Sequence, residues 1–298
     1  MRIVIAGSSG MIGRALTAAL RERGDRVVRL VRHEPGDADE LRWDPSTGYL
    51  DPEALAGADA VVNLSGASLS KLPWTKAYRR EILGSRITAT TAIVGALHER
   101  ARLGTPVPVL ISGSAVGVYG SRPGEVLTEE SAPGGGFLAE VVRAWEASAA
   151  SAPAETRVVF ARTGLVVGPD GATAPLRLMA RFGLAGPLGG GRQYWPWVAL
   201  ADEVGALVHL IDSPIAGPVN IVGPEPATAG DVIRAVAAHE HRPYWLPAPS
   251  FAVSAGLGAA GRELLLSDQQ IHATVLADDG FAFLYRTIDE AVAAVNRT

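Results

Sequence analysis

The sequence predicts an α/β fold, a doubly wound parallel sheet with a smaller C-terminal substrate lobe. Up to residue 168, short β-branched runs such as residues 3–6 alternate with amphipathic helical segments. A glycine-rich turn joins the first run to the first helix. Beyond residue 222, helical segments broken by proline and glycine replace this alternation. Alternating strands and helices form a parallel sheet with helices on both faces.

The N-terminal elements form one βαβ unit. Residues 3–6 are expected to be a buried strand, and the helix after the turn carries Ile12, Leu16 and Leu20 on one apolar stripe. Gly24 is expected to end that helix, and residues 26–31 form the second strand.

The later elements continue the pattern. We expect strands at residues 59–64, 109–112, 157–162 and 218–222, and helices at 74–102, 137–150 and 201–211. Five glycines and a proline make residues 183–192 a loop. These elements place a Rossmann domain at residues 1–168, with 195–222 returning to it, and a smaller lobe at 223–298, with 169–194.

Composition excludes several kinds of site. The 298 residues include no cysteine, which rules out disulfides, thiol nucleophiles and cysteine-bound metals. Six scattered histidines without an H-E-x-x-H pattern predict no metal site. The net charge is −4 and no basic run occurs, so we expect no nucleic-acid partner. Apolar runs stop well short of ~18 residues, which predicts a soluble, cytoplasmic protein without a membrane span.

The glycine turn lies between a strand and a helix, where a dinucleotide-binding motif belongs. Gly7 permits the tight turn, Gly10 lets a pyrophosphate approach, and Gly13 lets helix and strand pack closely. The helix N-terminus favours phosphate through its free N–H groups and dipole. A purely structural turn is the alternative. The residues that we expect to contact a cofactor here are Gly7, Ser9, Gly10, Met11, Ile12 and Gly13.

The end of the second strand selects the cofactor. An acidic residue there binds the ribose 2′-hydroxyl of NAD, whereas an arginine accommodates the 2′-phosphate of NADP. Arg32 occupies this place, and the first acidic residue, Glu34, comes after it. The sequence therefore favours NADP over NAD, unless Arg32 is only a solvated surface charge.

Several motifs resemble those of the extended short-chain dehydrogenase/reductase superfamily. They are the glycine turn, residues 61–67 and residues 112–120. The chain is more similar to an atypical, epimerase-like branch whose members carry a C-terminal domain of unknown function. The marks of this branch are residues 84–86, 137–140, 145–146, 162–168, 186–191, 197–198 and 263–266.

This resemblance implies NADP contacts along the carboxyl edge of the sheet. The implied contacts are Arg32, Leu64, Ser65, Glu81, Arg86 and Arg162. Leu64 and Ser65 end a strand, where ligands bind in open α/β sheets. Glu81 and Arg86 are five residues apart and do not form an ideal helical ion pair, although a surface pair is the alternative. Arg162 ends a buried strand, so its charge must be paired or face a cleft.

The usual catalytic pair of the superfamily, a tyrosine followed four residues later by a lysine, is absent. None of the six tyrosines has that lysine, and Leu138 and Val142, or their neighbours, lie where the pair is expected. Ser112 and Ser114 could bind a substrate carbonyl or hydroxyl, with Tyr119 as proton donor.

Other roles for nearby residues stay open. Glu140 is an alternative proton donor if burial raises its pKa, and the two serines could be plain turn residues. Trp195 and Trp197 could either wall a substrate pocket or belong to the core.

Three functions fit these observations. The first is an NADP(H)-dependent oxidoreductase or epimerase acting on a small carbonyl or hydroxyl compound. The second is a non-catalytic NADP(H)-binding sensor or interaction protein, which the missing tyrosine and lysine favour. A sugar-nucleotide epimerase ranks third, because that chemistry depends on the absent tyrosine. The expected partner is a small-molecule substrate, and the sequence is compatible with a homodimer.

Overall fold

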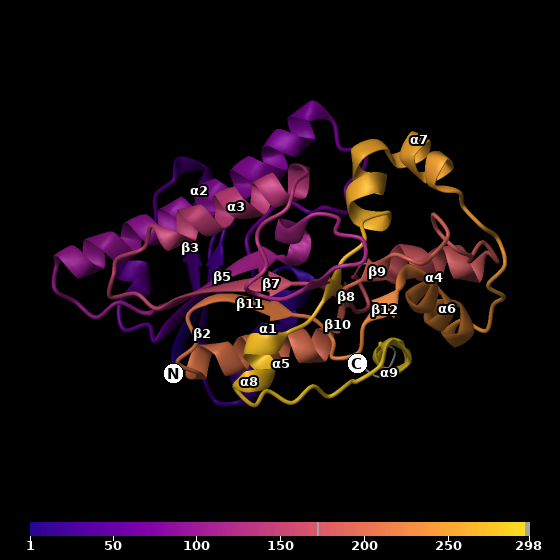
Figure 1. Ribbon diagram of the computed structural model, residues 1–298. Helices are drawn as coiled ribbons and strands as arrows, with labels where there is room; N and C mark the ends of the chain where they lie inside the picture. Colours follow the sequence, from indigo (N-terminus) through magenta and orange to yellow (C-terminus); the bar gives the residue numbers. More distant parts are fainter. Residues whose placement is uncertain (172, 296–298) are drawn as a thin grey trace.

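A computed structural model describes residues 1–171 and 173–295. Its centre is a seven-stranded sheet in the order β11-β7-β5-β4-β1-β2-β3, in which every neighbouring pair is parallel (Figure 1). The predicted parallel α/β fold is therefore confirmed. The strands of the sheet are β1 (Arg2–Ala6), β2 (Arg26–Val31), β3 (Glu40–Arg42), β4 (Ala60–Asn63), β5 (Val109–Ala115), β7 (Val158–Thr163) and β11 (Gly217–Ile221).

Helices cover both faces of this sheet (Figure 1). On one face, α1 (Met11–Glu22) and α5 (Leu200–Asp212) pack on β1, β4 and β7. On the other, α2 (Lys76–Arg102) and α3 (Phe137–Ala150) lie side by side. The stripe predicted on α1 is confirmed, since Leu16 and Leu20 are fully buried and Ile12 packs against the same core.

A small lobe stands at the carboxyl end of the sheet (Figure 1). Its core joins α4 (Thr173–Arg181), α6 (Ala229–His239) and α9 (Ile288–Ala294) to Trp195 and Trp197. The other helices are α7 (Ser250–Ala260) and α8 (Thr274–Asp278), with short helical turns η1 (Pro45–Thr47), η2 (Pro52–Leu55), η3 (Val116–Tyr119) and η4 (Gly261–Leu265).

Three pairs of very short strands hold the lobe and its connections together, and the sequence did not predict them as pairs. They are β8 (Leu165–Val167) with β10 (Trp197–Ala199), β9 (Tyr194–Trp195) with β12 (Ala227–Thr228), and β6 (Val126–Leu127) with β13 (Gln270–Ile271). The expectation of a purely helical segment after residue 222 was thus incomplete. Strands this short contain too few residues to show a periodic pattern.

Segments far apart in sequence meet through buried polar contacts. The Gln269 side chain donates to the carbonyl oxygens of Val116 (3.0 Å) and Gly120 (2.9 Å), and the Asp268 carboxylate accepts from the Tyr194 N–H (2.8 Å). The C-terminal segment is therefore bound to the loop after β5. In the part of the chain that the structure describes, no helix combines the length and the apolarity needed to cross a bilayer.

Candidate functional site at the carboxyl edge of the sheet

Two of the three glycines in the turn are required by packing. Gly7 has φ +84°, and a Cβ there would lie 2.7 Å from the Leu64 carbonyl carbon and oxygen. A Cβ on Gly13 would lie 2.2 Å from the Gly7 carbonyl oxygen. The turn after β1 therefore passes directly against the end of β4 and beneath α1, and side chains at these two positions would push the three elements apart.

At Gly10, neither the packing nor the backbone conformation requires a glycine. Its φ of −71° suits any residue, and a Cβ would come no closer than 3.4 Å, to the Gly7 carbonyl oxygen. Gly10 is exposed, as is Ser9. It begins α1, whose N-terminus has neither a side-chain cap nor an acidic residue in its first turn. The helix thus presents backbone N–H groups and positive dipole to an open surface.

Met11 and Ile12 contribute to this surface through their backbone. Both side chains pack against the core, and a Cβ built on Gly168 would lie 2.9 Å from the Met11 sulfur. The side chains therefore anchor the start of α1 and leave the backbone N–H groups of its first turn as the groups that can face a ligand.

The end of β4 is fixed by a buried amide that the sequence analysis missed. Asn63 is fully buried, and its side chain donates to Thr90 Oγ1 (3.0 Å) and accepts from the Ser65 N–H (3.1 Å). The Leu64 N–H donates to the Ala6 carbonyl (2.8 Å). Leu64 and Ser65 therefore lie beside the glycine turn, and their contact with a cofactor stays a prediction. A polar residue closing an apolar strand was the available signal for Asn63.

Arg86 extends from α2 to the same edge. Its Nη1 donates to the carbonyl oxygens of Ala67 (3.1 Å) and Ile82 (2.9 Å), and its guanidinium lies 5.1 Å from the Trp145 ring centroid. Burial lowers the pKa of Arg86 to about 10. Glu81, earlier on α2, is exposed. The structure thus places Arg86 near Ser65 and the loop that follows β4.

A hydrogen-bonded network crosses β5, β7 and β11. Arg162 Nε and Nη2 donate to the two carboxylate oxygens of Glu146 on α3 (2.8 and 2.9 Å). Ser114 Oγ donates to Glu146 Oε1 (2.6 Å). Arg162 Nη1 also donates to the Tyr119 hydroxyl (2.8 Å), which donates to Asn220 Oδ1 (2.8 Å). The predicted residues Ser114, Tyr119 and Arg162 therefore share one network.

This network sets the charge and hydrogen-bonding state of its members. Burial lowers the pKa of Arg162, but the hydrogen bonds and charge of Glu146 more than offset that effect and raise it above its usual value. Burial raises the pKa of Tyr119, whose side chain is fully enclosed. Because the Ser114 hydroxyl proton is directed to Glu146, Ser114 can only accept a hydrogen bond from a ligand in this arrangement.

Ser112 lies outside this network. It is fully buried, and its hydroxyl donates to the Gly113 carbonyl (3.2 Å). Sequence reasoning missed Glu146 as the partner of Ser114 and Arg162, although the need to pair a buried arginine pointed to some carboxylate.

The positions of the missing catalytic pair are packed. Val142 is buried beside Tyr119, and Leu138 packs against the cluster of Trp74 and Tyr78. Glu140 is exposed. A carboxylate from the C-terminal segment binds the start of α3: Glu263 accepts from the N–H groups of Phe137 (2.9 Å) and Leu138 (3.1 Å).

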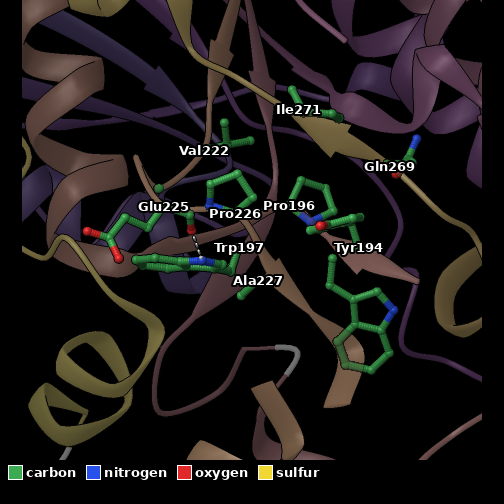
Figure 2. A pocket seen from close by; sticks show the side chains of 11 residues that line it. Tyr194, Pro196, Trp197, Val222, Glu225, Pro226, Ala227, Gln269 and Ile271 are labelled. Carbon is green, nitrogen blue, oxygen red and sulfur yellow. Dashed lines mark hydrogen bonds between the residues drawn. The ribbon is translucent and has the colours of Figure 1, made fainter. Parts of the chain in front are cut away.

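A small hollow lies near the sheet, between the tryptophans of the small lobe and the β13 segment (Figure 2). Trp197 Nε1 donates to the Glu225 carbonyl (2.9 Å), and both Trp195 and Trp197 belong to the core of the lobe while lining the hollow. The core role of the two tryptophans is therefore confirmed, and their role in a substrate pocket stays a prediction. Among residues 1–171 and 173–295, no group of His, Asp and Glu side chains forms a metal-binding cluster.

Two protein families match separate parts of the chain. Residues 3–222 match the NAD dependent epimerase/dehydratase family, and residues 248–295 match a domain of unknown function, DUF1731. Epimerase family protein Mb2239 of Mycobacterium bovis is 42% identical over 295 residues, covering 97% of this chain and 96% of that protein.

Two solved structures are similar over nearly the whole chain. The human epimerase family protein SDR39U1 with NADPH has a TM-score of 0.88 and 28% identity, with complete coverage of both chains. A nucleoside-diphosphate sugar epimerase from Corynebacterium glutamicum has a TM-score of 0.81 and 31% identity, covering 99% of this chain and 58% of that one. The resemblance predicted from the motifs is confirmed: the chain belongs to the NAD dependent epimerase/dehydratase family, in its SDR39U1-like, atypical extended short-chain dehydrogenase/reductase branch.

Proposed function

We propose that this protein binds NADP(H) and acts as an oxidoreductase or epimerase on a small carbonyl or hydroxyl compound. The observation that carries the proposal is Gly10: packing explains Gly7 and Gly13, whereas Gly10 keeps an uncapped helix N-terminus open to the outside. A pyrophosphate is the ligand that such a turn accommodates. The NADPH in the human relative supports the same cofactor.

The other contacts in this proposal follow the edge of the sheet. Leu64 and Ser65 lie beside the turn, with Arg86 behind them and Arg162 farther along, while Glu81 is the exposed member on α2. Arg32 is exposed directly after β2 and forms no hydrogen bond or ion pair with the residues that the structure describes. An arginine at this place is free to hold the 2′-phosphate of NADP.

Calorimetric titration tests the preference for NADPH over NADH. We expect NADPH to bind more tightly than NADH, and Arg32→Ala to remove most of that preference while NADH affinity stays within about twofold. Arg26→Ala is the matched control, because Arg26 is an exposed arginine at the opposite end of β2, paired with Asp39 (3.1 Å). If the protein binds neither NADPH nor NADH, the proposed function is overturned.

Ser114 is the residue that we place against the substrate. When bound, the nicotinamide supplies or accepts a hydride. Ser114 Oγ accepts a hydrogen bond from the substrate hydroxyl because its own proton is held by Glu146. Tyr119 acts as a positioning residue through Arg162, and Ser112 supports the adjacent backbone. In oxidation of an alcohol, the substrate hydroxyl proton passes to Ser114 Oγ as the Ser114 proton passes to the Glu146 carboxylate, and reduction of the carbonyl runs this proton transfer in reverse.

A panel of carbonyl and hydroxyl compounds, followed by nicotinamide absorbance, tests this role. Ser114→Ala should lower turnover at least tenfold without changing NADPH affinity. Ser148→Ala is the control, since its hydroxyl only bonds within α3, to the Ala144 carbonyl (2.9 Å). Equal turnover by Ser114→Ala and Ser148→Ala would show that Ser114 has no role in the reaction.

A non-catalytic NADP(H)-binding protein is the second candidate. It is favoured by the apolar side chains of half-buried Leu138 and buried Val142 at the expected place of the tyrosine and lysine. Tight NADPH binding with no turnover across the panel would favour this function, and turnover abolished by Ser114→Ala would exclude it.

A further inference from the structure

Arg42 lies one strand beyond Arg32 at the same edge of the sheet. The register pairs Ala6 of β1 with Leu30 of β2, and Val31 of β2 with Arg42 of β3. The glycine turn, the end of β2 and Arg42 therefore lie on adjacent strands at the same edge of the sheet. Neighbouring strands are about 4.8 Å apart. A cofactor whose pyrophosphate lies on the turn extends its adenosine ribose across the end of β2. The long side chain of Arg42 is then within reach of that ribose.

The side chain of Arg42 is directed toward this place. It is 61% exposed and pairs with Glu34, which belongs to the loop immediately after β2. Leu41, by contrast, packs against the core beneath α2, so neighbouring residues of β3 face opposite sides of the sheet. The Arg42 guanidinium is therefore held over the segment that contains Arg32, not over the outer edge of β3.

The charges of Arg32 and Arg42 both reach the carboxylate of Asp44. Hydrogen bonds from Ser46 are the main cause of the lowered pKa of Asp44, and the charges of Arg42 and then Arg32 add to it. The Asp44 carboxylate is already occupied by the Ser46 N–H (2.9 Å) and hydroxyl (2.6 Å). The only acidic side chain bound directly to Arg42 in the described structure is thus Glu34, in an exposed pair of the kind that stabilises a fold very little.

We propose that Arg42 is a second guanidinium for the 2′-phosphate of NADP(H), and that Glu34 is the counter-ion it exchanges for that phosphate. The inference rests on the proposed NADP(H)-binding function and adds a residue that determines cofactor preference. A phosphate carries up to two charges and three acceptor oxygens, so it competes effectively with one exposed carboxylate. Two arginines from adjacent strands can then bind different phosphate oxygens.

Calorimetric titration of the full chain with NADPH, NADH and 2′,5′-ADP tests this inference. Arg42→Ala should weaken NADPH and 2′,5′-ADP about tenfold, the loss expected for one charge-assisted contact, and leave NADH within about twofold. Glu34→Gln should tighten NADPH about threefold, because the guanidinium no longer has to leave a carboxylate. Arg26→Ala should leave all three ligands unchanged.

The outcomes separate this inference from the function on which it depends. If wild-type protein binds NADPH, and Arg32→Ala removes the preference while Arg42→Ala does not, the NADP(H) function stands and the role of Arg42 is wrong. Equal weakening of NADPH and NADH by Arg42→Ala also overturns it. If wild-type protein binds neither dinucleotide, the proposed function itself fails. Thermal unfolding of each variant verifies that the exposed substitutions leave the fold intact.

Discussion

Gly10 and Gly13 differ in what a methyl group on each would contact. At Gly10 it would meet only the Gly7 carbonyl oxygen at 3.4 Å, whereas at Gly13 it would lie 2.2 Å from that oxygen. Gly10→Ala should therefore cost no more than about 1 kcal/mol of unfolding free energy and weaken NADPH at least tenfold. Gly13→Ala should cost about 2–3 kcal/mol. Urea unfolding measures the stability of the two variants, and calorimetric titration measures their affinity for NADPH. Normal NADPH binding by Gly10→Ala would contradict the pyrophosphate site.

Glu203 is a buried carboxyl group that is not among the proposed contacts. It is fully enclosed on α5, accepts one hydrogen bond from Thr163 Oγ1 (2.7 Å), and its other oxygen has no partner among the described residues. Burial raises its pKa to about 8, and the Thr163 hydrogen bond only partly opposes this. The folded protein therefore favours the neutral form of Glu203.

The stability should consequently fall as the pH rises. A folded-state pKa above the unfolded value stabilises the fold fully below about pH 4.5, and this contribution is lost toward pH 8. Denaturant unfolding between pH 5 and 8.5 should show a loss of roughly 2–4 kcal/mol, which Glu203→Gln abolishes. Glu240→Gln is the control, because paired arginines Arg181 and Arg177 lower the pKa of Glu240 to about 2, outside this range. A pH slope unchanged in Glu203→Gln would refute the assignment.

At the scale of elements, α3 begins without a cap of its own. Gly136 offers no side chain, and Glu263 from η4 accepts from the first two backbone N–H groups instead. Glu263→Ala should lower the unfolding free energy by about 1–2 kcal/mol, because those groups lose a charged acceptor at the positive end of the helix. Glu130→Ala, an exposed glutamate in a loop, should change it by less than about 0.5 kcal/mol. Similar losses in both variants would argue against the cap.

The same helix shows how far the sequence could predict the structure. The bounds of α3 and the buried stripe of α1 were predictable because several turns repeat the apolar pattern. The glycine turn was predictable because its three glycines lie within seven consecutive residues between a strand and a helix. The pairing of Glu263 with α3 was not, since 126 residues separate Glu263 from Phe137 and neither position shows a local pattern. Asn63 and Glu146 were missed for the same reason: their partners are close only in the folded chain.

At the scale of the whole molecule, the small lobe and the sheet share their packing. Trp197 lies in the core of the lobe, yet β10 pairs with β8 directly after β7. Gln269 is buried and ties the C-terminal segment to the turn after β5. We therefore expect calorimetry to show one unfolding transition, with calorimetric and van't Hoff enthalpies that agree.

We expect the Gln269→Leu variant to unfold in a single transition as well, but at a lower temperature. The substitution leaves two carbonyl oxygens without their donor and should cost about 2–3 kcal/mol, which lowers the single Tm of a chain of this length by roughly 3–5 °C. Two separate transitions, in the wild type or in the variant, would show that the lobe unfolds by itself.

The position of α9 in the core of the lobe also has a consequence for biosynthesis. Ile288, Ala291 and Val292 fill the space beside α6 and Trp197, so that core is incomplete until they have been translated. The strands β1 to β5 can pair with one another and with β7 while the ribosome is still working, since these strands all lie N-terminal to residue 164. The partners of β6 and of the other edge of β7, which are β13 and β11, come later. During that interval, the tryptophans and the apolar side of α6 remain in contact with water, and the nascent chain is most in need of a chaperone.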